Sequence, residues 1–281
     1  MLPHSLFRLT QRVYNTPHLI TPQAFNVILD YLDSRNAVGS PELLKDEQYV
    51  AATQEKPYAD GLGVLRVDGS LTYKPVMTLC GEAGTSYQNL VEQVEEMAEA
   101  GVRTLVMEVT SGGGEASHLF QAADEIRAVL DHYEIRSIGY ADTVAASAAY
   151  GLICICDEVI ANPSADVGSI GCVVALMDMS KAYEQAGLKR IFITSGESKV
   201  PFAADGSFKQ EFLDDIQESV DKLNAEFAAH VSKYTGLSVD AIMALQAKCF
   251  DADVALSHGL VNQVMTNKEF AAYVAKTHKG I

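Results

Sequence analysis

Apolar residues recur at two spacings along the chain, which predict helices in some stretches and strands in others. Near the start, a Thr21 cap, Pro22 in the first turn and apolar residues three or four positions apart predict an amphipathic helix over residues 20–34. The stretch that follows is polar and weakly periodic, which is typical of a linker. We therefore expect an N-terminal helix and flexible arm over residues 1–60 and a separate domain over residues 61–281.

Beyond residue 60, short apolar runs alternate with amphipathic segments. The apolar runs cover residues 63–67, 103–109, 136–141, 158–162, 170–178 and 190–195. Helical spacing is found over residues 87–97, 119–130, 181–187 and 208–231. Strands that alternate with helices in this way favour an α/β fold with a largely parallel sheet flanked by helices.

The chain of 281 residues has the composition of an ordinary soluble protein, with 48% hydrophobic and 21% charged residues. Its formal net charge of −16 argues against nucleic acid as a partner, because affinity for phosphate backbones comes mainly from Lys and Arg. No apolar run reaches the ~18 to 20 residues that cross a bilayer, and the N-terminal sequence lacks the apolar core of a signal peptide. We expect a cytoplasmic protein with no membrane anchor.

The five cysteines lie in apolar surroundings, without CxxC spacing or nearby histidine pairs. This pattern favours buried thiols in a reducing compartment over a disulfide framework or a zinc site. The sequence also lacks an HExxH motif and any cluster of His and Asp that would indicate metal-assisted hydrolysis. We therefore expect neither a metal ion nor another cofactor.

Three short stretches that follow predicted strands carry residue types that catalysis needs. The first is "TSGGGEAS", in which Gly112, Gly113 and Gly114 precede a predicted helix. Glycines let the backbone approach a ligand closely, and the amides at the start of a helix favour an anion. The turn could therefore bind an oxyanion, although a tight strand-to-helix connection or a phosphate site would use the same residues.

The second stretch, "TVAASAAYGLI", places Ser147 at the start of an apolar helix. Such a serine is either a helix cap or a nucleophile on a strand-to-helix elbow, and the G-x-S-x-G form of the hydrolase elbow is absent. The third stretch, "ITSGESKV", places Lys199 in a turn, where a lysine is normally a solvated charge. It could act as a general base if burial lowered its pKa from ~10.4 to about 8, a difference of ~3.3 kcal/mol.

Histidine is the rival general base. His118 lies shortly after the three glycines, but no nearby stretch indicates the carboxylate that a Ser-His-Asp triad places behind the imidazole. We interpret His118 as a packing or surface residue.

Taken in order, "TSGGG", "AASAAYGLICICDEVIANPSADVGSIG" and "ITSGESK" resemble the signal peptide peptidase family of Ser-Lys proteases. That family carries a P-G-G turn, a serine elbow, a P-x-x-x-x-G-S-x-G stretch and an S-G-x-x-K loop, and the similarity runs from about residue 62 to 265. The resemblance implies a Clp protease/crotonase-like fold of stacked ββα units. It also implies a homo-oligomer in which one subunit could supply the lysine to its neighbour's serine.

The same resemblance assigns a role to each motif. It implies that Ser147 is the nucleophile, that Lys199 is the general base, and that Ser169 in "VGSIG" orients the lysine amine. Gly113, together with Gly114 and the amide of the serine itself, would form the oxyanion hole, whose donors contribute about 10²- to 10³-fold each.

The branch of the family follows from the N-terminal sequence "PHLITPQAF", which resembles that of soluble tailed-phage prohead proteases of the lambda type. The resemblance implies scaffold, capsid or portal proteins as substrates, and the host cytoplasm, within the immature virion head, as the location. Two departures are visible. Gly112 stands where the family turn usually has proline, and "SAA" replaces the common "SGG" after the serine, which would narrow the space around an acyl-enzyme.

Three other interpretations fit the same sequence. A bacterial cytoplasmic peptidase of this family would carry the same motifs. An acyl-coenzyme A enzyme on the related crotonase fold would use Glu115 as its acid or base, but it would leave Ser147 and Lys199 without a role. A noncatalytic assembly protein would keep the fold as a shell component.

Overall fold

A large, mainly parallel sheet forms the centre of the protein. The computed structural model describes residues 13–37, 57–75, 77–78, 81–82, 84–189, 191–203 and 205–280. In the large sheet, β10 (Arg136–Ala146) pairs in parallel with β8 (Thr104–Ser111) on one side and with β11 (Glu158–Ala161) and β12 (Asp166–Gly168) on the other. The sheet continues through β3 (Leu62–Asp68), β2 (Tyr58–Ala59), β13 (Cys249–Asp251) and β14 (Gln263–Val264).

A second, smaller sheet lies beside the first and includes the glycine turn. Its strands, in spatial order, are β1 (His18–Ile20), β9 (Gly113–Glu115), β4 (Leu71–Thr72) and β7 (Thr85–Ser86). A separate two-stranded ribbon joins β5 (Met77–Thr78) to β6 (Gly81–Glu82).

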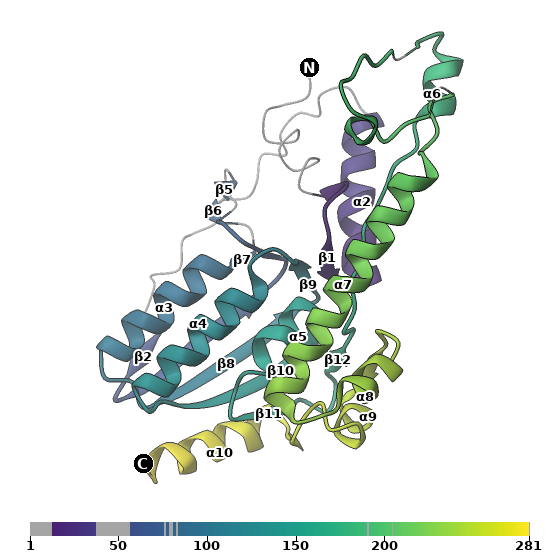
Figure 1. The fold of residues 1–281 in the computed structure, drawn as a ribbon. Coiled ribbons are helices and arrows are strands. Elements are labelled where there is room, and N and C mark those ends of the chain that lie inside the picture. The colour runs from purple at the N-terminus through teal and green to yellow at the C-terminus, as the bar shows by residue number, and fades with distance from the viewer. Residues whose placement is uncertain are drawn as a thin grey trace.

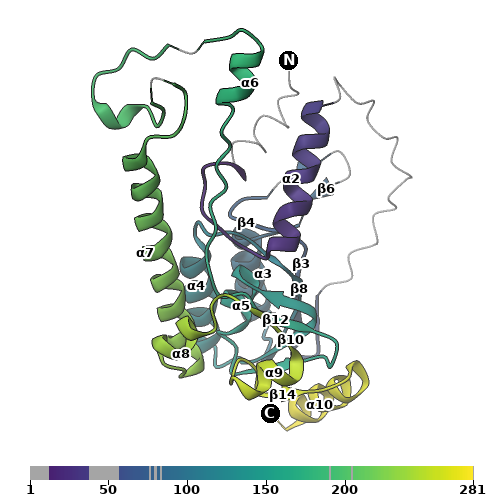
Figure 2. The ribbon, with the colours of Figure 1, turned by 90° about the vertical axis from the view of Figure 1, so that its right-hand side faces the viewer.

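Helices cover both faces of the large sheet (Figures 1 and 2). On one face lie α3 (Tyr87–Glu99), α4 (Leu119–His132), α5 (Ala148–Ile153) and the long α7 (Gln210–Thr235). On the other face lies α10 (Asn267–Lys279). The remaining helices are α2 (Pro22–Ala37), α6 (Ser180–Gln185), α8 (Val239–Ala244), α9 (Ala252–Ser257) and the short 3₁₀ turn η1 (Glu197–Lys199).

The central strands are buried on both faces because their side chains alternate between two apolar clusters. In β8, Leu105 and Met107 belong to the main core under α3 and α4, whereas Val106 belongs to the smaller core under α10. Tyr140 of β10 stacks on Phe270 of α10 with a 3.9 Å centroid distance. No helix in the described part of the chain is both long enough and apolar enough to cross a membrane.

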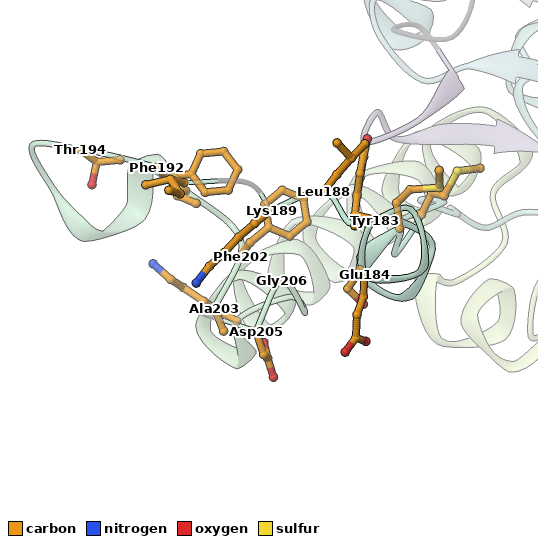
Figure 3. A pocket seen from close by; sticks show the side chains of 17 residues that line it. Tyr183, Glu184, Leu188, Lys189, Phe192, Thr194, Phe202, Ala203, Asp205 and Gly206 are labelled. Atoms are coloured by element: carbon orange, nitrogen blue, oxygen red, sulfur yellow. The ribbon is translucent and has the colours of Figure 1, made fainter.

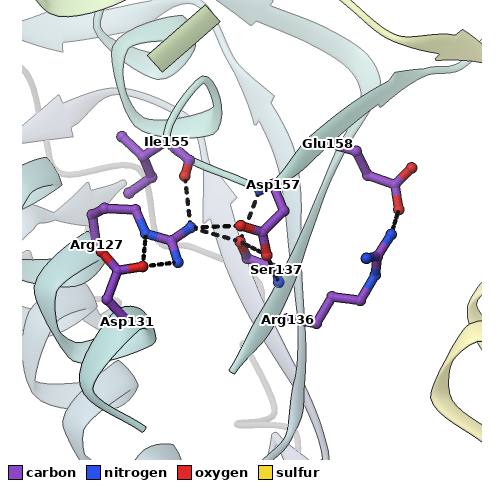
Figure 4. A network of polar contacts seen from close by, with 7 residues as sticks. All are labelled: Arg127, Asp131, Arg136, Ser137, Ile155, Asp157 and Glu158. Carbon is purple, nitrogen blue, oxygen red and sulfur yellow. Dashed lines mark hydrogen bonds and ion pairs between the residues drawn. The ribbon is translucent and has the colours of Figure 1, made fainter. Parts of the chain in front are cut away.

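An arginine on α4 fixes the segment that follows α5. The Arg127 guanidinium donates to the carboxylate of Asp157, 3.0 Å away, and to the Ile155 carbonyl, 3.1 Å away (Figure 4). The Asp157 carboxylate in turn accepts from the backbone amide of Ser137 on β10, at 2.8 Å. This network ties the end of α5 to the start of β10.

The structure confirms the predicted α/β fold and most of its elements. The predicted helix at residues 20–34 forms as α2, and the Thr21 side chain accepts from the Ala24 amide. The proposed boundary at residue 60 stays a prediction, and residues 1–12 and 38–56 of the proposed arm lie outside the described residues.

Two apolar runs differ from the expected pattern. Residues 170–178 make only isolated bridges, to Tyr14 and His18. The prediction of a strand at 190–195 is wrong for the single chain. The described residues of this stretch are irregular and exposed, and no strand in the described part of the chain pairs with them.

A buried histidine joins α7 to α5. The Nε2 atom of His230 lies 2.8 Å from the Gly151 carbonyl oxygen, and a neutral imidazole donates this hydrogen bond. Gly151 leaves room for the contact, since an added Cβ would lie 3.2 Å from the ring of Phe227 on α7. Burial lowers the pKa of His230 below its ordinary value.

We predict that acid weakens the fold partly through His230. The folded protein holds the imidazole neutral, so stability from this site is present above pH ~6.5 and is lost as pH falls through the lower folded-state pKa. A His230→Gln chain keeps an amide donor without titrating. Between pH 7 and pH 5, the unfolding midpoint of the wild type should therefore fall further than that of the variant. Equal pH dependence in scanning fluorimetry would contradict this assignment.

Candidate active site

Ser147 occupies a strained elbow between β10 and α5. Its backbone has φ 57° and ψ −123°, a conformation that costs a non-glycine residue about 1–3 kcal/mol. Two hydrogen bonds hold it there: the Ser147 amide donates to the Gly168 carbonyl at 2.8 Å, and the Ser147 carbonyl accepts from the Gly151 amide at 3.0 Å. The side chain caps no amide of α5, so the helix-cap interpretation of this serine is wrong.

The hydroxyl of Ser147 is buried and unpaired. The residue has 0% exposure, and its Oγ atom has no hydrogen-bond partner within the described residues. An unpaired buried polar group costs about 1–3 kcal/mol, so folding alone does not favour one. A strained backbone and an unpaired hydroxyl at one residue indicate a functional position.

The glycine turn packs directly against this serine. Gly113 has φ +98°, and an added Cβ would lie 3.0 Å from both the Cβ of Ser147 and the amide nitrogen of Ala148. Only glycine fits at such a position. Gly113 therefore lies beside Ser147, as the family resemblance implied.

Two features of this turn were not visible in the sequence. The Gly113 amide donates to the Ser111 hydroxyl at 3.1 Å, and that hydroxyl donates to the Gly69 carbonyl at 2.6 Å. Ser111 thus orders the turn. Its hydroxyl accepts from the Gly113 amide, which is the amide that was predicted to bind an oxyanion. The Ser147 amide is likewise engaged, whereas Ala148 supplies the first amide of α5, which has no acceptor inside the helix.

Gly114 has a packing role that the sequence did not indicate. An added Cβ at Gly114 would lie 2.0 Å from the carbonyl oxygen of Leu71 on β4. This glycine therefore permits the close pairing of β9 with β4 in the small sheet.

Ser169 lies next to the residue that holds the serine elbow. It is buried at 5% exposure, has φ 53°, and its amide donates to the Lys248 carbonyl at 2.8 Å. Because Gly168 accepts from the Ser147 amide, the parallel pairing of β10 with β12 brings the two serines into neighbouring positions.

Lys199 lies outside this group in the single chain. It is exposed at the end of η1, on the segment between residues 172 and 209 that projects away from the large sheet (Figures 1 and 2). The structure thus brings Gly113, Ser147 and Ser169 together but does not bring the lysine to them within one subunit.

The projecting segment lines an open cavity of about 910 Å³ (Figure 3). Its walls include Tyr183, Phe192 and Phe202, and the ring of Phe202 stacks on Phe208 just before α7. None of the predicted site residues lines this cavity. It is therefore separate from the serine elbow.

The rival acid–base residues have structural partners. The Glu115 carboxylate accepts from the Tyr73 amide at 2.8 Å. The exposed His118 ring stacks on the Tyr73 ring with a 3.6 Å centroid distance, and its Nδ1 lies 2.7 Å from the Ser117 hydroxyl. His118 thus lies at the surface against an aromatic ring, as the sequence predicted.

Comparison with known proteins supports the peptidase interpretation. Residues 131–281 match the model of peptidase family S49. The chain is 26% identical over 242 residues to a head-tail preconnector protein of enterobacteria phage P21, covering 84% of this chain and 48% of that protein. It is 25% identical over 245 residues to capsid assembly protease C of Escherichia phage lambda, covering 85% of this chain and 54% of that protein.

A more distant relative comes from an archaeon. A putative protease of Methanocaldococcus jannaschii is 24% identical over 187 residues, 65% of this chain and 58% of that protein. The chain spans about half the length of the two phage relatives. The family match confirms the expected Clp protease/crotonase-like fold.

We predict that Ser147→Ala leaves stability unchanged or raises it slightly, because the lost hydroxyl has no partner. Ser137→Ala is the matched control. Ser137 is equally buried, on the strand β10 that leads to Ser147, but its hydroxyl donates to the Asp157 carboxylate at 3.1 Å and accepts from the Asp157 amide at 3.0 Å. Chemical denaturation should show a loss of about 1–3 kcal/mol for Ser137→Ala only. A comparable loss for Ser147→Ala would mean that the hydroxyl has a structural partner.

Proposed function

The chain belongs to peptidase family S49, and from this membership we propose that it is a serine endopeptidase with a Ser147–Lys199 dyad. The observation that carries the proposal is the strained elbow, which holds a buried, unpaired hydroxyl against a glycine turn. A fold under selection for stability alone would avoid both the backbone strain and the unpaired group.

In the proposed reaction, a neutral Lys199 amine takes the proton from the Ser147 hydroxyl as the oxygen attacks the substrate carbonyl carbon. The carbonyl oxygen becomes an oxyanion, which the backbone amides of Gly114 and Ala148 would stabilise, together with the Gly113 amide once it leaves the Ser111 hydroxyl. The intermediate then collapses, the peptide C–N bond breaks, and the leaving amine receives the proton from the lysine ammonium. Water, activated by the same amine, hydrolyses the acyl-enzyme. The Ser169 hydroxyl would orient the amine.

The proposed dyad requires a second copy of the chain. Within one chain Lys199 is exposed, and it lies on the projecting segment, away from the serine elbow. The same segment exposes large apolar side chains, which is unfavourable in a monomer. Ile191 is 78% exposed and Ile193 is 96% exposed. We propose that this segment packs on a neighbouring subunit and delivers its lysine to that subunit's Ser147.

The phage relatives suggest the substrates. Their names refer to a head-tail preconnector and to capsid assembly, so we propose scaffold and capsid or portal proteins as substrates, cleaved inside an immature virion head in the host cytoplasm. The formal net charge of −16 suits a protease that works against basic or partly disordered protein segments.

An active-site serine probe tests the nucleophile. A fluorophosphonate should label the wild type at Ser147, and Ser147→Ala should lose the label together with at least about 10³-fold of the casein-cleaving activity. Ser137→Ala serves as the folded serine control and should still be labelled. An unlabelled wild-type protein that is folded would contradict the proposal and favour the noncatalytic alternative.

Mixing two inactive chains tests the shared dyad. Ser147→Ala and Lys199→Ala chains should each be inactive, and unfolding and refolding them together should restore up to about a quarter to a half of the wild-type activity, since some mixed sites hold both groups. Lys189→Ala, which removes another exposed lysine of the same segment, should retain activity alone. No recovery in the mixture, despite mixed oligomers in native mass spectrometry, would place both groups of the dyad in one chain.

A further inference from the structure

Strand β1 lies between two segments of the candidate active site. On one side its residues pair antiparallel with β9, His18 with Glu115 and Ile20 with Gly113. On the other side, the His18 amide donates to the Val173 carbonyl at 2.9 Å, and the Val173 amide donates back to the His18 carbonyl at 2.9 Å. An N-terminal segment thus forms a ladder between the glycine strand and the segment that follows Ser169.

The backbone of β1 also approaches the candidate nucleophile. A Cβ added to Gly113 would lie 2.2 Å from the Leu19 carbonyl oxygen and 3.0 Å from the Cβ of Ser147. The Leu19 carbonyl and the serine therefore face the same glycine at close range. The residue after the strand, Thr21, donates its amide to the Gly112 carbonyl at 2.8 Å.

An extended peptide is commonly recognised by strand addition at a free sheet edge. Strand β9 has two neighbours, β1 and β4, and β4 is followed in the sheet by β7. The edge of β9 that faces Val173 is thus filled by the chain's own β1. A substrate strand that pairs with the glycine turn beside Ser147 needs the place that β1 occupies.

The attachment of β1 to the main core depends on one side chain. Leu19 is fully buried in the main core. The flanking side chains instead form a cluster of their own, made of Val13, Ile20, Phe25 and Leu32. The ladder with β9 and Val173 and the hydrogen bonds from Asn15 to Ala175 and from Thr21 to Gly112 hold β1 to the site. Leu19 is the residue of β1 that packs in the main core, so the strand can separate while the rest of that core stays intact.

We propose that β1 is an autoinhibitory strand that takes the place of an extended substrate beside Ser147. This inference rests on the proposed peptidase function. Protein substrates bind after β1 has left its position between β9 and Val173, and Leu19 must leave the main core in that step.

A reversible cross-link in the full chain tests the proposal. His18→Cys and Val173→Cys face each other in a hydrogen-bonded antiparallel pair, whose Cα separation of ~5.5 Å suits a disulfide. The neighbouring Cys172 is replaced by Ala in all chains. Fluorescein-labelled casein is the substrate, and the chain with His18→Cys alone controls for the oxidant.

The oxidised double-cysteine chain should cleave casein at least tenfold more slowly than the same chain after reduction, while the single-cysteine control should not respond. Equal rates in the oxidised and reduced states, with the cross-link confirmed by mass spectrometry, would overturn the autoinhibitory role and leave the peptidase proposal intact. If the wild type and the reduced chain both fail to cleave casein, the peptidase proposal fails and the strand proposal falls with it.

A second pair of variants avoids dependence on the cross-link. Leu19→Ala weakens the anchor in the main core, whereas Leu32→Ala makes the same change at a fully buried leucine of the arm's own cluster. Leu19→Ala should raise the initial rate of casein cleavage at least fivefold above that of Leu32→Ala. Equal or lower activity in a folded Leu19→Ala chain would count against inhibition by β1.

Discussion

The hydrogen bond from the Ser147 amide to the Gly168 carbonyl is the contact on which the candidate site depends. It is the last step of the parallel pairing between β10 and β12, and it holds Ser147 in a backbone conformation that serine does not favour. The buried sheet supplies the rigidity for this strain, because β10 also pairs with β8 along most of its length. The elbow, the glycine turn and Ser169 are therefore positioned by one strand and its two neighbours.

In the proposed mechanism, one subunit positions the serine but does not supply its general base. Its hydroxyl is unpaired, the Gly113 amide is held by Ser111, and the nearest backbone of the N-terminal segment lies across the glycine turn. Assembly would supply the base, and departure of β1 would open the strand position. Such a chain would be inactive when newly made and active only in the assembled form, which suits a protease that acts inside a closed shell.

Sequence periodicity predicted the α/β fold because it reports local burial, which is strong in α4, β8 and α7. The placement of Ser147 after a strand and beside a glycine turn also followed from local motifs. The pairing of β1 with β9 could not be predicted, because it joins segments far apart in the chain and involves only three residues. Among the described residues no strand pairs with the stretch 190–195, and the position of Lys199 depends on that same projecting segment.

The most direct test of this account is an experimental structure of the assembled protein. We expect the Nζ atom of Lys199 from one subunit to lie within hydrogen-bonding distance of the Ser147 Oγ atom of a neighbour, in a site closed to water. This expectation would be contradicted by an assembly in which every Lys199 ammonium is solvated and a different side chain contacts the serine hydroxyl.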